Sequence, residues 1–305
     1  MDHIALAVKD LRKTYGDVVA VDGVDFAVNR GEIFGLLGPN GAGKTTILEC
    51  LEGIRQPDDG TLDVLGVDPA REPRKLRSLI GVQLQSSGLP ATMTAREAMR
   101  FFCAYHGVRP RYDLLERLGV AEKQHAQYEK LSTGQQRRLA LALAVAHEPP
   151  IVFLDEPTAG LDVASRAELH ELMQELREAG TALIMATHDM AEAEKMTDRV
   201  ATLLRGRIVT TGSPTELTAA GEGYTKVSVR TERFLLSRNG TRFPAVTQRL
   251  VDDDYVIYYT TDPGPTVSAI LSALDTEGDR LIDLRVERPS LEERFLELTN
   301  HGGTS

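Results

Sequence analysis

A glycine-rich loop that ends in a lysine and two threonines, GPNGAGKTT, occupies residues 38–46 between an apolar run and a helical pattern. Its spacing fits G-x-x-x-x-G-K-[ST], in which the glycines let backbone N–H groups surround phosphate oxygens. We expect Lys44 to reach the β- and γ-phosphates of a nucleotide and the Thr45 hydroxyl to bind Mg²⁺. A plain glycine turn is the alternative, which the strand–loop–helix context disfavours. The residues expected to contact the nucleotide are Gly38, Pro39, Asn40, Gly41, Ala42, Gly43, Lys44, Thr45 and Thr46.

Two carboxylates end an apolar run in IVFLDE, residues 151–156. A buried strand that ends in two acids indicates a use for them, because carboxylates are rarely buried without a partner. We expect Asp155 to hold Mg²⁺, directly or through water. Glu156 is expected to orient or deprotonate the water that attacks the γ-phosphate. Two acids at an exposed strand end is the alternative interpretation, and the presence of a phosphate loop disfavours it.

A second small polar turn, LSTGQQRR at residues 131–138, precedes a run rich in Ala and Leu. Ser132 offers a hydroxyl, Gly134 lets a backbone approach closely, and the N-terminus of the following helix favours an anion. Taken alone, the segment indicates an N-capped helix start and no more.

Composition restricts the classes of protein to which these motifs can belong. The 305 residues carry 35 Lys and Arg against 45 Asp and Glu, a formal net charge of −10. A nucleic-acid surface needs an excess of basic residues, so we expect no nucleic-acid partner.

Cys50 and Cys103 lie far apart without metal-ligand spacing, which indicates two reduced thiols. No apolar run reaches the length of about 18 residues that spans a membrane, and the N-terminus lacks a signal-peptide pattern. We therefore expect a soluble chain that meets a membrane only through a partner.

Alternating helical and apolar segments predict an α/β core with a mainly parallel sheet. The segments before the phosphate loop alternate in polarity and predict antiparallel strands in a β subdomain. Thr94 and Glu97 form a capping-box pattern that opens a mostly helical stretch, residues 92–148. Farther along, the composition changes at a glycine-rich segment. We expect a domain boundary there, between residues 4–219 and a small C-terminal α+β domain, residues 220–305.

The motifs together resemble those of one protein family. In order and spacing they match the nucleotide-binding subunits of ATP-binding-cassette (ABC) transporters, over residues 4–217: GPNGAGKTT, Gln85, LSTGQQRR, IVFLDEP, AGLD (159–162) and THD (187–189). The resemblance implies a P-loop ABC ATPase domain with a mainly parallel core sheet, an antiparallel β subdomain and a helical subdomain. It also implies a head-to-tail homodimer with ATP and Mg²⁺ at the interface.

The same resemblance assigns a role to the second polar turn. In this family each LSTGQ-type turn caps the γ-phosphate of the ATP bound by the partner subunit, which makes Ser132, Gly134 and Gln135 nucleotide contacts. The family usually has glycine at the position of Thr133, so this chain departs from the pattern there. The remaining residues are retained, and we expect a working signature turn.

Four further residues take roles from the resemblance. Tyr15 matches the aromatic residue that stacks on adenine, and Asp162 matches the residue that communicates across the dimer. Gln85 matches the glutamine that senses Mg²⁺ and the γ-phosphate; Gln83 is a rival that the pattern IGVQLQ disfavours. His188 matches the switch histidine that contacts the γ-phosphate. Lys44, Glu156 and His188 are thus the expected catalytic residues, and Thr45, Gln85 and Asp155 are the expected metal contacts.

The C-terminal segment carries a second resemblance. SLEERFLELT (290–299), after a small α+β module, is similar to the end of ABC subunits of the daunorubicin-resistance drug-exporter type. This implies ATP-driven export of drug-like, lipid-like or polysaccharide-type substrates through an integral membrane permease. The chain would lie at the cytoplasmic face of the membrane and receive the permease at residues 92–105.

The alternative function is that of a soluble ABC-type ATPase in translation or DNA maintenance. Such proteins carry two cassettes in one chain, a long coiled coil or a zinc module. This sequence has one cassette, no heptad run and no cysteine cluster, which disfavours the alternative.

Overall fold

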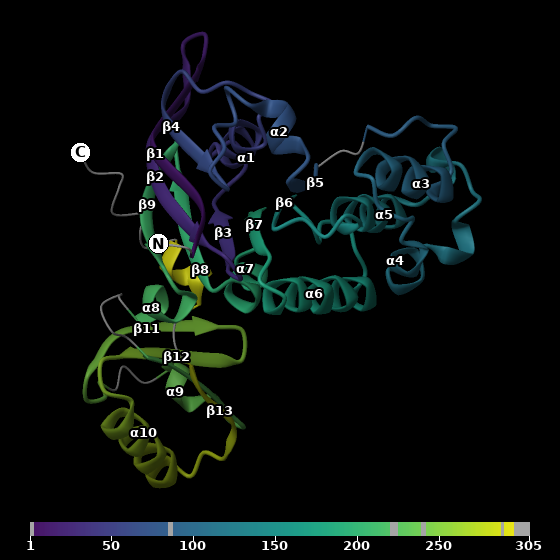
Figure 1. Cartoon of the computed structure of the whole chain (residues 1–305). Helices are drawn as coiled ribbons and strands as arrows, with labels where there is room; N and C mark the ends of the chain where they lie inside the picture. The colour runs from purple at the N-terminus through teal and green to yellow at the C-terminus, as the bar shows by residue number, and fades with distance from the viewer. Residues whose placement is uncertain (1–2, 85–87, 220–224, 239–241, 288–289, 296–305) are drawn as a thin grey trace. The chain divides into compact units, whose positions relative to one another are not determined.

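The computed structural model describes residues 3–84, 88–219, 225–238, 242–287 and 290–295, and Figure 1 shows the course of the chain. The chain divides into two compact units, Met1–Ser213 and Pro214–Ser305. The boundary expected between residues 219 and 220 lies at the far end of helix α8 (Pro214–Ala219), which groups with the second unit. Among the described residues, no helix is long and apolar enough to cross a membrane.

The first unit is built on a six-stranded sheet with the strand order β5-β6-β7-β3-β8-β9. Five strands run parallel, and β9 is the antiparallel half of a hairpin with β8. Strands β3, β6 and β7 are buried along their whole length, which explains their continuous apolar sequences. The strands are β3 (Ile33–Leu37), β5 (Ile80–Gln83), β6 (Ile151–Asp155), β7 (Ala182–Thr187), β8 (Arg199–Leu204) and β9 (Arg207–Gly212). The predicted mainly parallel core is confirmed.

Alternate residues of the central strands face opposite sides of this sheet. Phe153 packs in a cluster with the antiparallel β subdomain, whereas its neighbours Val152 and Leu154 pack in a cluster with the helical subdomain. The β subdomain has the strand order β2-β1-β4. Its strands are β1 (Ile4–Tyr15), β2 (Val18–Asn29) and β4 (Asp59–Val64). The predicted pair β1 and β2 is confirmed, and β4 adds a strand that the sequence interpretation did not contain.

The helices of the first unit cover both faces of the core sheet. Thr94 and Glu97 form the predicted capping box, because each side chain accepts a hydrogen bond from the other residue's backbone N–H. Helices α3, α4 and α5 pack on one another and form the helical subdomain (Figure 1). The helices are α1 (Lys44–Leu51), α2 (Pro73–Arg77), α3 (Ala95–Tyr105), α4 (Tyr112–Arg117), α5 (Thr133–Val145), α6 (Val163–Glu178) and α7 (Met190–Met196).

The second unit is a small α+β module. Its antiparallel sheet has the strand order β11-β12-β10-β13, and α10 packs its buried Ile270 against Val229 and Tyr258 of that sheet. Residues 291–295 are helical, and Glu293 accepts a hydrogen bond from Lys226 Nζ at 2.8 Å. Besides α8, the elements are β10 (Thr225–Thr231), α9 (Leu235–Arg238), β11 (Val246–Asp252), β12 (Tyr255–Thr260), α10 (Pro263–Glu277) and β13 (Leu281–Glu287).

Candidate nucleotide-binding site

The phosphate loop connects β3 to α1, and two of its glycines lie where a side chain would not fit. A Cβ on Gly43, whose φ is +106°, would lie 2.4 Å from the carbonyl oxygen of Ala20. A Cβ on Gly38 would lie 2.4 Å from the carbonyl oxygen of Leu203. The loop therefore packs directly against two neighbouring backbones, which fixes its curvature around the start of α1.

Lys44 is folded back onto its own loop. Its Nζ donates to the carbonyl oxygens of Gly38 at 2.7 Å and Pro39 at 3.2 Å, and it lies 3.9 Å from Glu156 Oε1. Burial lowers the pKa of Lys44, against the opposing charges of Glu156 and Asp155. A phosphate group would offer this buried ammonium a stronger partner than two neutral carbonyls do.

Asp155 ends strand β6 and meets the phosphate loop. Thr45 Oγ1 donates to Asp155 Oδ2 at 3.0 Å, so a hydroxyl and a carboxylate from distant parts of the sequence converge. Burial is the main cause that raises the pKa of Asp155, and the hydrogen bond from Thr45 opposes it. These oxygen donors fit Mg²⁺, which binds through one or two carboxylates and completes its shell with phosphate and water. The third expected metal contact, Gln85, lies outside the described residues.

Glu156 and His188 form a pair at the carboxyl edge of the sheet, where β6 and β7 end side by side. His188 Nδ1 lies 2.8 Å from Glu156 Oε1. The Glu156 side chain is buried, whereas that of His188 is 53% exposed. The backbone N–H of Glu156 donates to the carbonyl of Ala186, and φ of Glu156 is +50°, a left-handed conformation that costs energy for a residue with a side chain.

Arg137, which the sequence interpretation did not single out, contacts the same residue. Its guanidinium donates a hydrogen bond to the backbone carbonyl of Glu156. Arg137 belongs to α5, so this bond joins the signature helix to the residue in the left-handed conformation. The only sequence signal was its position within LSTGQQRR, directly after the residues of the turn itself.

Buried polar groups hold the segment after β7. Thr187 Oγ1 donates to Glu192 Oε2 at 3.2 Å and accepts from the Asp189 backbone N–H at 3.0 Å. Asp189 in turn caps α7 by accepting from the Glu192 backbone N–H at 2.9 Å. The backbone on both sides of His188 is therefore fixed while its ring remains half exposed.

The signature turn forms a capped helix start in the free chain. Ser132 Oγ accepts from the Gln135 backbone N–H at 3.2 Å, and Gln135 Oε1 accepts from the Ser132 backbone N–H at 3.0 Å. Asp162 similarly caps α6 by accepting from the Ser165 backbone N–H at 2.8 Å, and these bonds lower the pKa of Asp162. In the described part of the chain, the hydrogen bonds of these three side chains stay within their own turns. A Cβ on Gly134 would lie 3.5 Å from Leu161 Cδ2, so the two turns adjoin.

Tyr15 ends strand β1 and is 39% exposed. The Arg55 guanidinium lies 5.0 Å and the Lys13 ammonium 5.8 Å from the ring centroid. Lys13 is held by Asp58 at 2.6 Å. Stacking of Tyr15 on adenine stays a prediction, since the ring already has cationic neighbours.

Comparison with known proteins gives a consistent result. The ABC transporter family matches residues 21–159. The daunorubicin resistance ATP-binding protein DrrA3 of Streptomyces coeruleorubidus is 36% identical over 98% of this chain and 97% of its own length. The Nod factor export ATP-binding protein I of Ralstonia nicotianae is 36% identical over 96% of this chain and 93% of its own length. A solved dimeric bacterial ABC transporter cassette is 26% identical with a TM-score of 0.62, over 68% of this chain and 98% of its own.

The fold and the site define a P-loop ATPase cassette, and the full-length similarities identify the family. This chain belongs to the ABC transporter family. It is an ATP-binding, ATP-hydrolysing subunit of that family, and the alternative of an ABC-type ATPase in translation or DNA maintenance is not supported. Such subunits dimerise and work with membrane permease components.

Proposed function

We propose that this chain powers the export of a drug-like, lipid-like or polysaccharide-type molecule through a separate membrane permease. The observation that carries the proposal is the pairing of Glu156 with His188 beside Lys44, at the edge where β3, β6 and β7 end. Export is supported by the relatives, one named for daunorubicin resistance and another for Nod factor export. The chain would work at the cytoplasmic face of the membrane.

Each side chain of the site has a task that its environment suits. Lys44 would exchange its carbonyl partners for the β- and γ-phosphates of ATP. Glu156 would accept a proton from the attacking water or orient it, and His188 would hold Glu156 and contact the γ-phosphate. Thr45 and Asp155 would hold Mg²⁺, with Gln85 as a further contact. When bound, Mg²⁺ neutralises charge on the phosphate oxygens.

The signature turn would complete the site of a second copy of the chain. Ser132, Gly134 and Gln135 lie at the N-terminus of α5, where the helix dipole favours an anion. In a two-fold homodimer this turn would cap the γ-phosphate bound by the partner subunit, and Asp162 would lie beside the shared interface. ATP binding would then favour the closed dimer, which hydrolysis opens.

The test is purification of the tagged chain from mild-detergent extracts of its native cells, followed by mass spectrometry of the bound proteins. We expect a polytopic membrane protein in a stoichiometric amount. Ribosomal or DNA-repair proteins without any membrane protein would contradict the proposal. In parallel, the purified chain should hydrolyse ATP, and Glu156→Gln should abolish most of that activity.

A further inference from the structure

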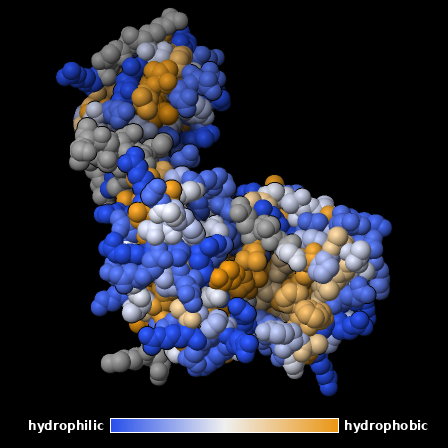
Figure 2. Space-filling model, turned by 90° about the horizontal axis from the view of Figure 1, so that it is seen from above, coloured by the Kyte–Doolittle hydropathy of each residue, from blue (hydrophilic) through white to orange (hydrophobic). Residues whose placement is uncertain are grey.

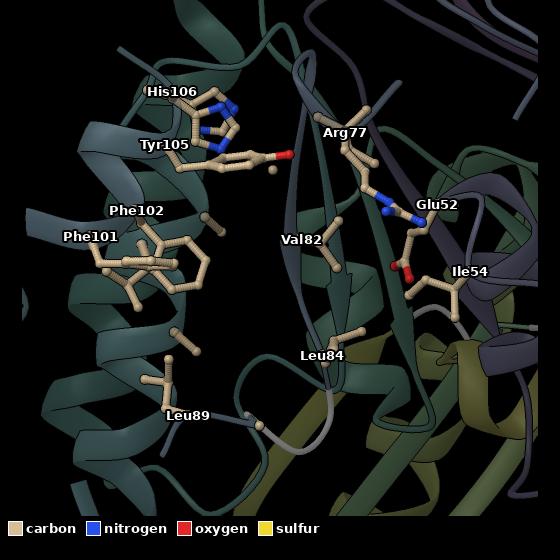
Figure 3. A pocket seen from close by; sticks show the side chains of 17 residues that line it. Glu52, Ile54, Arg77, Val82, Leu84, Leu89, Phe101, Phe102, Tyr105 and His106 are labelled. Atoms are coloured by element: carbon tan, nitrogen blue, oxygen red, sulfur yellow. The ribbon is translucent and has the colours of Figure 1, made fainter. Parts of the chain in front are cut away.

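An apolar groove lies between the helical subdomain and the core of the first unit. It is a cavity of about 540 Å³, bounded by α3, α5, β5 and the end of α1. Figure 2 shows apolar side chains gathered in a hollow of the surface, and Figure 3 shows the groove from close by. Pockets that hold small molecules typically measure about 300 to 1,000 Å³. The groove is therefore large enough for a ligand of that kind.

Aromatic rings form one wall of the groove. Phe101, Phe102 and Tyr105 of α3 line it, and Figure 3 shows their rings along the same side. Phe101 and Tyr105, one turn apart, are 59% and 64% exposed. His106 and His147 also line the groove and stack with ring centroids 3.6 Å apart. Aromatic rings stack on other flat rings and attract cations to their faces, so this wall suits an aromatic or cationic ligand.

One carboxylate faces the aromatic wall. Glu52 follows the last residue of α1 and lines the opposite side of the groove (Figure 3). It is only 3% exposed, and its Oε2 accepts no hydrogen bond in the described part of the chain. A buried carboxylate oxygen without a partner is strongly unfavourable. Because Glu52 is buried, its partner must be a group small enough to enter the cavity.

The charges nearest to Glu52 are negative. Burial is the main cause that raises the pKa of Glu52 to about 8, and the charges of Asp155 on β6 and Glu49 on α1 add to it. Glu49 has its own partner in Arg55, at 2.6 Å, which therefore does not serve Glu52. The C-terminal end of α1 also disfavours an anion and favours a cation, because of the helix dipole.

The other titratable groups of the lining do not neutralise Glu52. Arg77 lines the groove from α2, but it is exposed, and among the described residues no ion pair joins it to Glu52. Burial lowers the pKa of His106, at the end of α3, and that of His147, after α5, the latter to about 4. Both rings are therefore neutral near pH 7. The groove thus combines an acid that lacks a cation with an apolar, aromatic wall.

We propose that this groove is a binding site for a small lipophilic amine, whose protonated nitrogen pairs with Glu52 and whose aromatic or apolar body packs against Phe101 and Tyr105. Such a molecule supplies the cation that the neighbouring charges and the helix dipole favour, and it covers exposed apolar surface. The site is separate from the phosphate loop, because α1, an eight-residue helix of about 12 Å, lies between Lys44 and Glu52. Amine and nucleotide can therefore bind together.

The experiment compares two ligands that differ in one group, on the purified full-length chain. Naphthylmethylamine is a cation at pH 7, whereas naphthylmethanol has the same ring system and a neutral hydroxyl. Ligand-observed NMR titrations give the two dissociation constants. We expect the amine to bind at least about tenfold more tightly than the alcohol, because only the amine offers a charge to Glu52.

A second readout follows the proton of Glu52. Because its pKa is about 8, most Glu52 side chains are protonated at pH 7 in the free chain. Pairing with a cation ionises the carboxyl, so amine binding should release about one proton per ligand. Calorimetry in buffers of different ionisation enthalpy measures this release, and the alcohol should release none.

Three variants locate the site. Glu52→Gln should bind the amine and the alcohol with similar affinity and release no proton. Ala140→Phe, which places a ring in the groove from α5, should weaken the binding of both ligands at least about fivefold. Glu178→Gln removes an exposed carboxylate at the end of α6 and should behave as wild type. Binding of a fluorescent ATP analogue shows that each variant is folded.

Four results would each overturn the inference. They are equal binding of the two ligands by wild type, no binding of the amine at millimolar concentration, a preference for the amine that survives Glu52→Gln, and undiminished binding of both ligands by a folded Ala140→Phe variant. The first two are measured on the unmodified chain, so they decide the matter even where a variant does not fold.

Discussion

Glu52 directly follows helix α1 and is only 3% exposed. Its replacement by glutamine should change how the stability of the first unit depends on pH. The ordinary pKa of the Glu52 side chain is 4.5, and in the folded chain it is raised to about 8. Between these values the folded state binds more protons than the unfolded state does. The contribution of Glu52 to stability is therefore fully present below the lower value and is lost as the pH rises through about 8.

The size of this effect follows from the two pKa values. For one group, the linkage relation gives a loss of roughly 2.5 kcal/mol in the free energy of unfolding between about pH 5 and pH 7. Glu52→Gln cannot titrate, so the free energy of unfolding of the variant minus that of wild type should rise by this amount over the same range. Urea unfolding followed by circular dichroism, on both proteins at several pH values, measures it.

Two further measurements make the result decisive. Carboxyl ¹³C NMR of labelled glutamate should show one resonance that titrates near pH 8 in wild type and is missing from Glu52→Gln. Glu178→Gln should show the same pH dependence of stability as wild type, because its carboxylate is exposed. A stability difference that stays constant within about 0.5 kcal/mol across the range would refute the argument, since it would mean that Glu52 ionises as freely in the folded chain as in water.

Four other outcomes are expected of the ATP site and of the domain division. Lys44→Ala should lose high-affinity ATP binding in isothermal titration calorimetry, and an unchanged affinity would remove this residue from the phosphate site. Glu156→Gln should bind ATP normally but turn it over at least about 10²-fold more slowly in a phosphate-release assay; near-normal turnover would exclude Glu156 from the chemistry. Arg137→Ala should lower kcat about tenfold with little change in ATP affinity, and Arg137→Lys should recover part of the loss, whereas a parallel loss of affinity would point to a general folding defect. A chain that ends at Ser213 should fold and bind ATP with wild-type affinity, and failure to fold would show that the two units depend on each other.

Local sequence pattern was sufficient for the elements that carry the phosphate chemistry. The strands that end at Leu37, Asp155 and Thr187 are buried on both faces, so each is an almost continuous apolar run. The capping pattern of Thr94 and Glu97 is equally local, because both residues lie within one helical turn. Such features do not depend on distant parts of the chain.

Elements stabilised by distant contacts escaped prediction. Strand β4 has the sequence DGTLDV, which by itself is typical of a turn, and it becomes a strand because β1 offers an edge to pair with. Helix α2 is only five residues long, too short for any periodic pattern. The roles inferred for Arg137 and Glu52 depend on what lies opposite each side chain. No spacing within the sequence shows that Arg137 reaches the carbonyl of Glu156 or that Glu52 lacks a cation.

Helix α5 belongs both to the groove and to the catalytic edge of the sheet. Ala140, Leu143 and Ala144 of this helix line the groove, and Arg137, one turn earlier, binds the carbonyl of Glu156. A helix transmits displacement along its axis with little internal compression, so a displacement of α5 would also move the Arg137 side chain that binds the carbonyl of Glu156. We expect a displacement of α5 to change kcat for ATP hydrolysis while the KM for ATP stays constant.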